Sequence, residues 1–204
     1  MMLSRSLSIF VACAALTLAA PVELLPGTRD VPTETCTKRT SGYLTGKGGQ
    51  KFAISKDGKH VVYAGSSSTS SGLEVEFQEC NPNFTQWSKP GNGPHVGHIY
   101  VPAVGKCLHV PSYEAGNTYS LLLDKCYYSH DSSQFALYFM QDGSNYYWSG
   151  ATTSDGSSIQ GKEDGCKSGL YGYQGAVHGA AKKSGQATVA CNSNPNVMAF
   201  MINA

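Results

Sequence analysis

This chain of 204 residues has little charge, no visible helical pattern and no recognised catalytic motif. Only 14% of its residues are charged and its formal net charge is +1, which argues against the clustered basic face that nucleic acids require. Gly-x-Ser-x-Gly, His-Glu-x-x-His and phosphate-binding glycine loops are all missing. We therefore expect no enzyme, no cofactor and no nucleic-acid partner.

Long apolar runs are also missing, apart from one near the N-terminus. Residues 7–18 are nearly all apolar, follow Arg5 and lead into small residues from Ala19 onward. About a dozen apolar residues cannot cross a bilayer core of roughly 30 Å, but they suit a secretory signal peptide. We interpret residues 1–19 as a signal peptide and residues 20–35 as an extended N-terminal arm. The mature protein is expected to be secreted and extracellular, without a membrane span.

A short phrase built around a cysteine recurs three times in the chain. An apolar run precedes Cys80, Cys126 and Cys191, and a polar turn and an aromatic residue follow each of them. A recurring unit that cannot bury a core alone predicts one domain with internal threefold pseudosymmetry. The repeats are expected at about residues 36–89, 90–140 and 141–204.

The cysteine count points to disulfides rather than to a metal site. One of the seven cysteines, Cys13, lies in the signal peptide, and the six that remain are an even set in an oxidising compartment. No Cys-x-x-Cys is present, so a zinc site of that kind is not expected. Spacing alone leaves several pairings open, and the repeats favour pairing within each repeat. The expected disulfides are Cys36–Cys80, Cys107–Cys126 and Cys166–Cys191.

Composition and turn signals predict an all-β domain. The chain has 23 glycines and 12 tyrosines, a profile typical of many short strands and tight turns. The Asp-Gly steps that begin at Asp57 and Asp142 tolerate positive φ and close hairpins. The flanking strands are expected at residues 51–55 and 60–63, and at 135–140 and 145–148.

The second repeat has a characteristic order of motifs. It contains GKCLHV at residues 105–110, a loop with Gly116, an apolar strand with Cys126, and Ser-Gln-Phe ending at Phe135. This order resembles one repeat of the ricin-B-type β-trefoil lectins, which reads Cys-x-Asp-Val, glycine-rich loop, apolar strand, cysteine and Gln-x-Trp. The resemblance is good over residues 97–139, moderate over the first repeat and weak over the third.

The resemblance implies a β-trefoil over residues 36–204. Within the family, the closing aromatic residue of each repeat points into the core that the repeats share. By that analogy, Trp87, Phe135 and Phe200 are expected to meet there.

The resemblance also implies a sugar site, but no repeat keeps the family's full set of residues. In the second repeat, His109 occupies the position of the family's sugar-binding aspartate. Asp124 could accept sugar hydroxyls, His109 could donate or accept, and Tyr127 and Tyr128 could stack on a pyranose face. We predict these four as carbohydrate-binding residues. The alternative is that the tyrosines cap the barrel and Asp124 is an exposed turn charge.

Two functions remain open after this comparison. The first is a secreted lectin-like module that binds extracellular or cell-wall glycans. The second is a secreted trefoil that binds a protein partner, such as a protease inhibitor or an interaction factor. The replaced aspartate weakens the first reading, because unpaired sugar hydroxyls lose about 1–3 kcal/mol each.

Some further residues have spacings that are found in metal sites, in glycosidase active sites or in glycosylation acceptors. His95 and His98 have metal-like spacing, and we assign them instead to the surface or a strand edge. Glu74 and Glu76 share one strand face, which we attribute to exposed charges rather than to a glycosidase pair. Asn83 begins an Asn-x-Thr acceptor for N-glycosylation. Whether the dibasic step at Lys38 is processed stays open.

Overall fold

The computed structural model describes residues 31–64, 72–85, 94–114, 116, 118–159, 166, 169–175 and 185–204. The compact unit Val31–Ala204 contains all of them. The signal peptide, most of the predicted arm and Trp87 lie outside the described residues, so the predictions for them stay predictions. No helix within the described part is long and apolar enough to cross a membrane.

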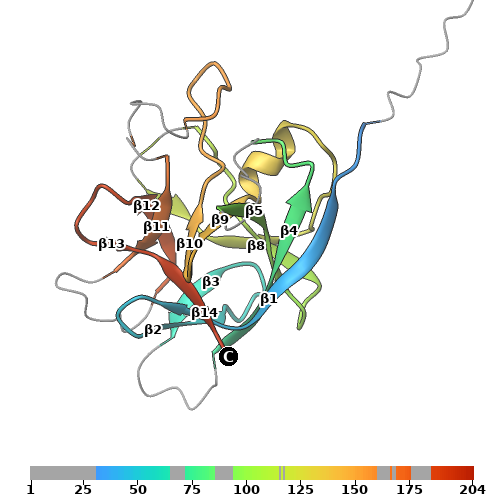
Figure 1. The fold of residues 1–204 in the computed structure, drawn as a ribbon. Coiled ribbons are helices and arrows are strands. Elements are labelled where there is room, and N and C mark those ends of the chain that lie inside the picture. Colours follow the sequence, from blue (N-terminus) through green and yellow to red (C-terminus); the bar gives the residue numbers. More distant parts are fainter. Residues whose placement is uncertain are drawn as a thin grey trace, which may run out of the picture. The chain divides into compact units, whose positions relative to one another are not determined.

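Antiparallel strands close into a barrel in which each strand pairs with the next and the last pairs with the first. In order around the barrel they are β1 (Thr35–Gly46), β4 (Leu73–Asn81), β5 (His95–Val101), β9 (Phe139–Asp142), β10 (Asn145–Trp148) and β14 (Phe200–Asn203). Figure 1 shows β1 running beside β4, with β14 at its other edge. Closure leaves these strands without a free edge.

A hairpin lies between the two barrel strands of each repeat. The hairpins pair β2 (Gln50–Ile54) with β3 (Val61–Ala64), β6 (Lys106–His109) with β8 (Leu122–Asp124), and β11 (Tyr171–Gln174) with β12 (Thr188–Cys191). Two short strands extend the third hairpin: β7 (Tyr119–Ser120) beside β12 and β13 (Val197–Met198) beside β11. A closed barrel with three such hairpins is a β-trefoil, as predicted.

Both Asp-Gly hairpins are present. Gly58 and Gly143 have φ of 69° and 58°, in the left-handed region that favours glycine at these turns. The strand before the second turn is shorter than predicted, because the 3-10 helix η1 (Ser132–Ala136) takes its first part. The Asp131 carboxylate accepts the backbone N–H of Ser133 at 2.9 Å and starts this helical turn.

The three predicted disulfides are confirmed. Cys36 and Cys80 lie directly opposite each other on the barrel strands β1 and β4. The other two disulfides lie at the cap hairpins: one links β6 to the segment after β8, and the other links Cys166, which precedes β11, to the end of β12.

The recurring cysteine phrase is therefore not structurally equivalent in the three repeats, which corrects the sequence reading. The phrase around Cys80 lies on barrel strand β4, whose counterparts in the other repeats are β9 and β14. The phrases around Cys126 and Cys191 follow or end hairpin strands. The prediction of three repeats was right, although the alignment of the first phrase with the other two was wrong.

Aromatic side chains fill the centre of the barrel. The Phe200 ring lies 5.4 Å from Phe52, 5.5 Å from Tyr173 and 6.2 Å from Phe139. Such ring pairs add to the free energy gained from apolar burial. Phe200 thus occupies the shared core, as expected.

Phe135 is buried too, but it does not reach this core. Its ring packs 5.1 Å from Phe84 and 5.9 Å from Tyr113. Its position in η1 explains the difference, because β9 begins after it and brings Phe139 to Phe200 instead. The expected meeting of Phe135 with Phe200 is therefore wrong.

Candidate binding cleft

A cleft of about 390 Å³ lies where the first hairpin meets the second. Its volume is within the range of about 300–1,000 Å³ that small-ligand sites occupy. Its lining combines basic, acidic and apolar side chains: Lys59, His60, Lys106, His109, Pro111, Leu122, Leu123 and Asp124.

Backbone hydrogen bonds hold the two sides of the cleft together. The N–H of Leu123 donates to the carbonyl of Lys59 at 2.8 Å, and the N–H of Val61 donates to the carbonyl of Leu121 at 3.0 Å. His60 and Leu122 form the bridge between these two bonds. The first hairpin is thereby fixed against β8, and the cleft is built across two repeats.

The turn that carries Lys59 and His60 is fixed by Asp57. Its carboxylate accepts the hydroxyl of Ser55, the backbone N–H of Lys59 at 3.0 Å and the Nδ1 of His60 at 3.2 Å. The hydrogen bond from Ser55 is the main reason why the pKa of Asp57 falls to about 2. Asp57 therefore stays ionised and shapes the turn.

The structure brings the predicted residues His109 and Asp124 into this cleft. Asp124 pairs with Cys107 across the hairpin and His109 pairs with Leu122, so the two side chains are diagonal neighbours on one face. Burial lowers the pKa of His109, and the Asp124 charge partly offsets this effect. Nδ1 of His109 is buried without a hydrogen-bond partner among the described residues, so a bound ligand would have to use Nε2.

The predicted residues Tyr127 and Tyr128 do not line the cleft. They are 42% and 38% exposed, on the segment that follows Asp124. The Tyr128 hydroxyl donates to the Oε1 of Gln78 at 3.2 Å, and its ring lies 5.4 Å from that of His98. The structure thus joins two of the four predicted residues in one site and places the tyrosines elsewhere.

Sequence reasoning missed Lys59, His60 and Lys106 as lining residues. Lys59 and His60 belong to the first repeat, some fifty residues before the predicted site, and no local pattern connects them with it. The available signal was the Asp57 turn itself, because a trefoil packs the hairpin of one repeat against that of the next.

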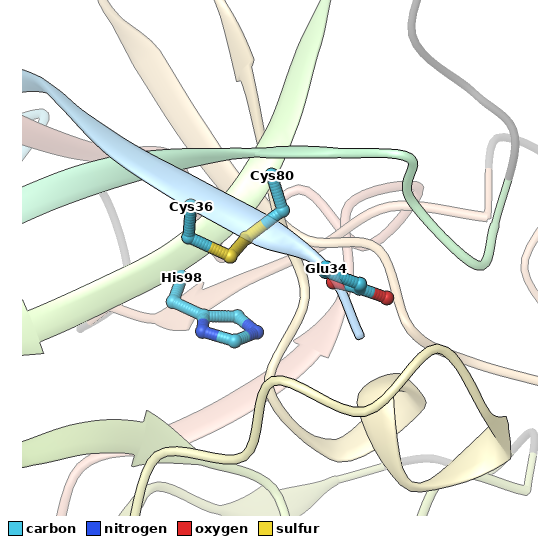
Figure 2. A group of neighbouring side chains, drawn as sticks. All are labelled: Glu34, Cys36, Cys80 and His98. Atoms are coloured by element: carbon cyan, nitrogen blue, oxygen red, sulfur yellow. A yellow bond between two sulfur atoms is a disulfide. The ribbon is translucent and has the colours of Figure 1, made fainter. Parts of the chain in front are cut away.

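A second gathering of titratable groups lies inside the fold beside β1, β4 and β5 (Figure 2). Ligand-type atoms of Glu34, Cys36, Cys80 and His98 lie within 4.8 Å of one another. The sulfurs of Cys36 and Cys80 are joined in a disulfide, and zinc sites use thiolates. Only two donors remain, so this group does not make a zinc site in the oxidised protein.

Two hydrogen-bonded pairs make up what we call the buried polar cluster, which consists of Glu34, His98, Gln134 and Tyr138, and the rings of His98 and Tyr138 lie 5.7 Å apart. His98 Nε2 donates to the Oε1 of Gln134 at 2.7 Å, and the Tyr138 hydroxyl donates to the Oε1 of Glu34. Burial lowers the pKa of His98 to about 4 and raises the pKa of Glu34. The cluster is a structural element that anchors the start of β1.

His95 and His98 are not surface residues, which corrects the sequence reading. They are 8% and 0% exposed. An odd separation along β5 sends their side chains to opposite faces, so they cannot share a metal ion. His95 instead donates from Nδ1 to Glu79 at 2.6 Å.

The remaining candidates have structural partners. Glu74 is exposed on β4, and Glu76 pairs with Lys38 at 3.2 Å. The predicted acceptor Asn83 is only 8% exposed, and its Oδ1 accepts the Thr85 hydroxyl at 2.9 Å. A glycan there would require this turn to open, and glycosylation stays a prediction.

A different depression, of about 470 Å³, lies along β1 and β4 and offers less chemistry. Among the described residues of its lining, Glu79 alone is charged, and its carboxylate already bonds Arg39 at 3.2 Å and His95 at 2.6 Å. The cleft beside His109 is the stronger candidate because, within the described residues, Lys59, Lys106 and Asp124 in its lining form no ion pair.

Comparison with solved structures supports the fold. Two single-residue variants of gallus interleukin-1 beta superpose with TM-scores of 0.54 and 0.53, at 8% and 9% sequence identity. Each match covers 84% of this chain and 99% of the other. No family model and no curated protein sequence matches the chain. At this identity the likeness concerns the trefoil alone.

Proposed function

We propose that this protein is a secreted glycan-binding module and that the cleft between the first and second hairpins is its sugar site. The observation that carries the proposal is the placement of His109 and Asp124 together in a cleft of about 390 Å³. Three disulfides support an oxidising, extracellular setting.

The cleft offers the chemistry that sugars need. Asp124 is exposed and supplies carboxylate oxygens that accept hydroxyl protons, and one of them also accepts the N–H of Lys125 at 2.7 Å. Lys59 and Lys106 supply donors from the other sides. Pro111 and Leu122 form an apolar surface against which sugar C–H groups can pack. Tyr127 and Tyr128 are left out of this scheme.

A glycan array of the refolded, disulfide-intact domain tests the proposal, followed by calorimetry on the glycans that bind. We expect binding that Asp124→Asn weakens and that Glu74→Gln, on exposed β4, leaves unchanged. Failure of the array to show any bound glycan would contradict the proposal.

A protein partner is the second candidate function, and the exposed tyrosines favour it. Tyr127 and Tyr128 project from the surface side by side in sequence, and tyrosine is enriched in protein interfaces. Loss of partner capture in a Tyr127→Ser, Tyr128→Ser variant, with glycan binding absent from the wild type, would favour this function.

A further inference from the structure

We propose that the cleft prefers an acidic saccharide, one that carries a carboxylate or a sulfate group. The inference rests on the proposed function and names the class of sugar. Its basis is the arrangement of charge in the cleft: among the described lining residues, Lys59 and Lys106 carry positive charge and Asp124 carries the one negative charge.

The two lysine charges are not neutralised by neighbouring side chains. Within the described residues, no ion pair includes Lys59 or Lys106, although other lysine, arginine and histidine side chains are paired. Lys106 Nζ makes one long hydrogen bond, to the carbonyl of Gly58 at 3.4 Å. Both ammonium groups therefore keep donors for a ligand.

Neither of the nearby carboxylates, Asp57 and Asp124, forms an ion pair with a lysine of the cleft. Asp57 does not line the cleft, and its carboxylate is occupied by Ser55, Lys59 N–H and His60. Asp124 lies farther than ion-pair distance from either lysine and already accepts the N–H of Lys125. Asp124 is thus left for hydroxyl groups, while the lysines are left for an anion.

The positions of the two lysines indicate where the acidic group of the sugar would bind. Lys59 is held by the Asp57 turn of the first repeat, whereas Lys106 lies on β6 of the second. A ligand that places its acidic group between them is held from both repeats. The lysine ammonium groups attract the opposite charge of a carboxylate or sulfate in addition to donating hydrogen bonds to it, and a hydroxyl at the same place offers the hydrogen bond alone.

Paired sugars test this inference directly. Uronic-acid trisaccharides would be compared by calorimetry with their methyl esters, which keep the ring and linkage but lose the charge. Sulfated trisaccharides and their unsulfated parents form a second pair and separate carboxylate from sulfate recognition. We expect the acidic member of at least one pair to bind about tenfold more tightly, and we expect added salt to weaken it.

Lysine variants locate the effect. Lys106→Met and Lys59→Met should each reduce the preference for the acidic sugar at least threefold, with unchanged thermal unfolding. Lys51→Met removes the same charge from an exposed position on β2 outside the cleft and should have no effect. Equal binding of acidic and neutral members would overturn this inference and leave glycan binding intact. No binding of any sugar would overturn both.

Discussion

The cleft and the buried polar cluster contain similar side chains but differ in their access to solvent. In the cluster, Glu34 Oε1 and His98 Nε2 have internal hydrogen-bond partners, Glu34 Oε2 and His98 Nδ1 have none among the described residues, and both side chains are excluded from solvent. In the cleft, Asp124 and the lysines face an open volume and retain unused hydrogen-bonding capacity. Proximity of titratable groups therefore does not identify a binding site. Access to solvent is what distinguishes the cleft from the cluster.

The largest expected effect concerns His98 and the stability of the cluster. Folding lowers the pKa of His98 to about 4 from about 6.5, so the unfolded chain takes up a proton that the folded protein does not. The contribution of neutral His98 to the free energy of unfolding is fully present above about pH 6.5. It falls by about 3 kcal/mol as the pH is lowered toward 4.

His98→Phe tests this by removing the titrating group. At pH 7 the variant should be less stable by about 1–3 kcal/mol, because Gln134 loses a buried partner. The difference in the free energy of unfolding between wild type and variant should shrink or reverse by pH 4, since only the wild type has lost the stability that neutral His98 provides. Urea unfolding at both pH values measures this difference. The same difference at pH 7 and pH 4 would count against a lowered pKa of His98.

The next largest expected effect is on the glycan affinity of the cleft. Asp124→Asn keeps an oxygen for the Lys125 N–H but replaces an ionised acceptor with a neutral one. Glycan affinity should fall about tenfold, equal to about 1.4 kcal/mol, while urea unfolding stays as in the wild type. Equal affinity in the variant would remove Asp124 from the site.

Glu34 should show the opposite pH sign to His98. Folding raises the pKa of Glu34. Its contribution to the free energy of unfolding is therefore complete below about pH 4.5 and is lost as the pH rises through the raised pKa. Glu34→Gln keeps an acceptor for the Tyr138 hydroxyl without the charge. Relative to the wild type, the variant should gain stability from pH 4 to pH 8 in thermal unfolding. A relative loss over that range would refute the raised pKa.

The smallest expected effect is at Tyr128, which lies outside the cleft. Tyr128→Ala should change the affinity of a cleft-bound glycan less than twofold in calorimetry, because its ring contacts His98 and Gln78 rather than the lining. A strong loss of glycan affinity would indicate that the sugar binds at Tyr127 and Tyr128 instead of in the cleft.

Local patterns were enough to predict the hairpins and the disulfides. Asp57-Gly58 and Asp142-Gly143 carry their turn geometry in two residues, and pairing within repeats joined the cysteines correctly. Recurrence predicted three repeats, although the phrase around Cys80 was matched to the wrong strands, and the β-trefoil was implied by the resemblance of the second repeat to the ricin-B-type lectins.

The cleft could be predicted only in part, since it depends on contacts distant in sequence. His109 and Asp124 belong to one hairpin and were found together. Lys59 reaches them through the contact between His60 and Leu122, which no spacing reveals. The burial of His98 likewise depends on residues distant in sequence, and Figure 2 shows Cys36 and Glu34 near its ring.

Amide chemical-shift mapping with a bound glycan tests the central claim most directly. Titration of the isotope-labelled, disulfide-intact domain should shift the amides of Lys59, His60, Lys106, His109 and Asp124, from two repeats, along one binding curve. The amides around Tyr128 and the buried polar cluster should stay in place. Shifts centred on Tyr127 and Tyr128, with the cleft unaffected, would contradict the account.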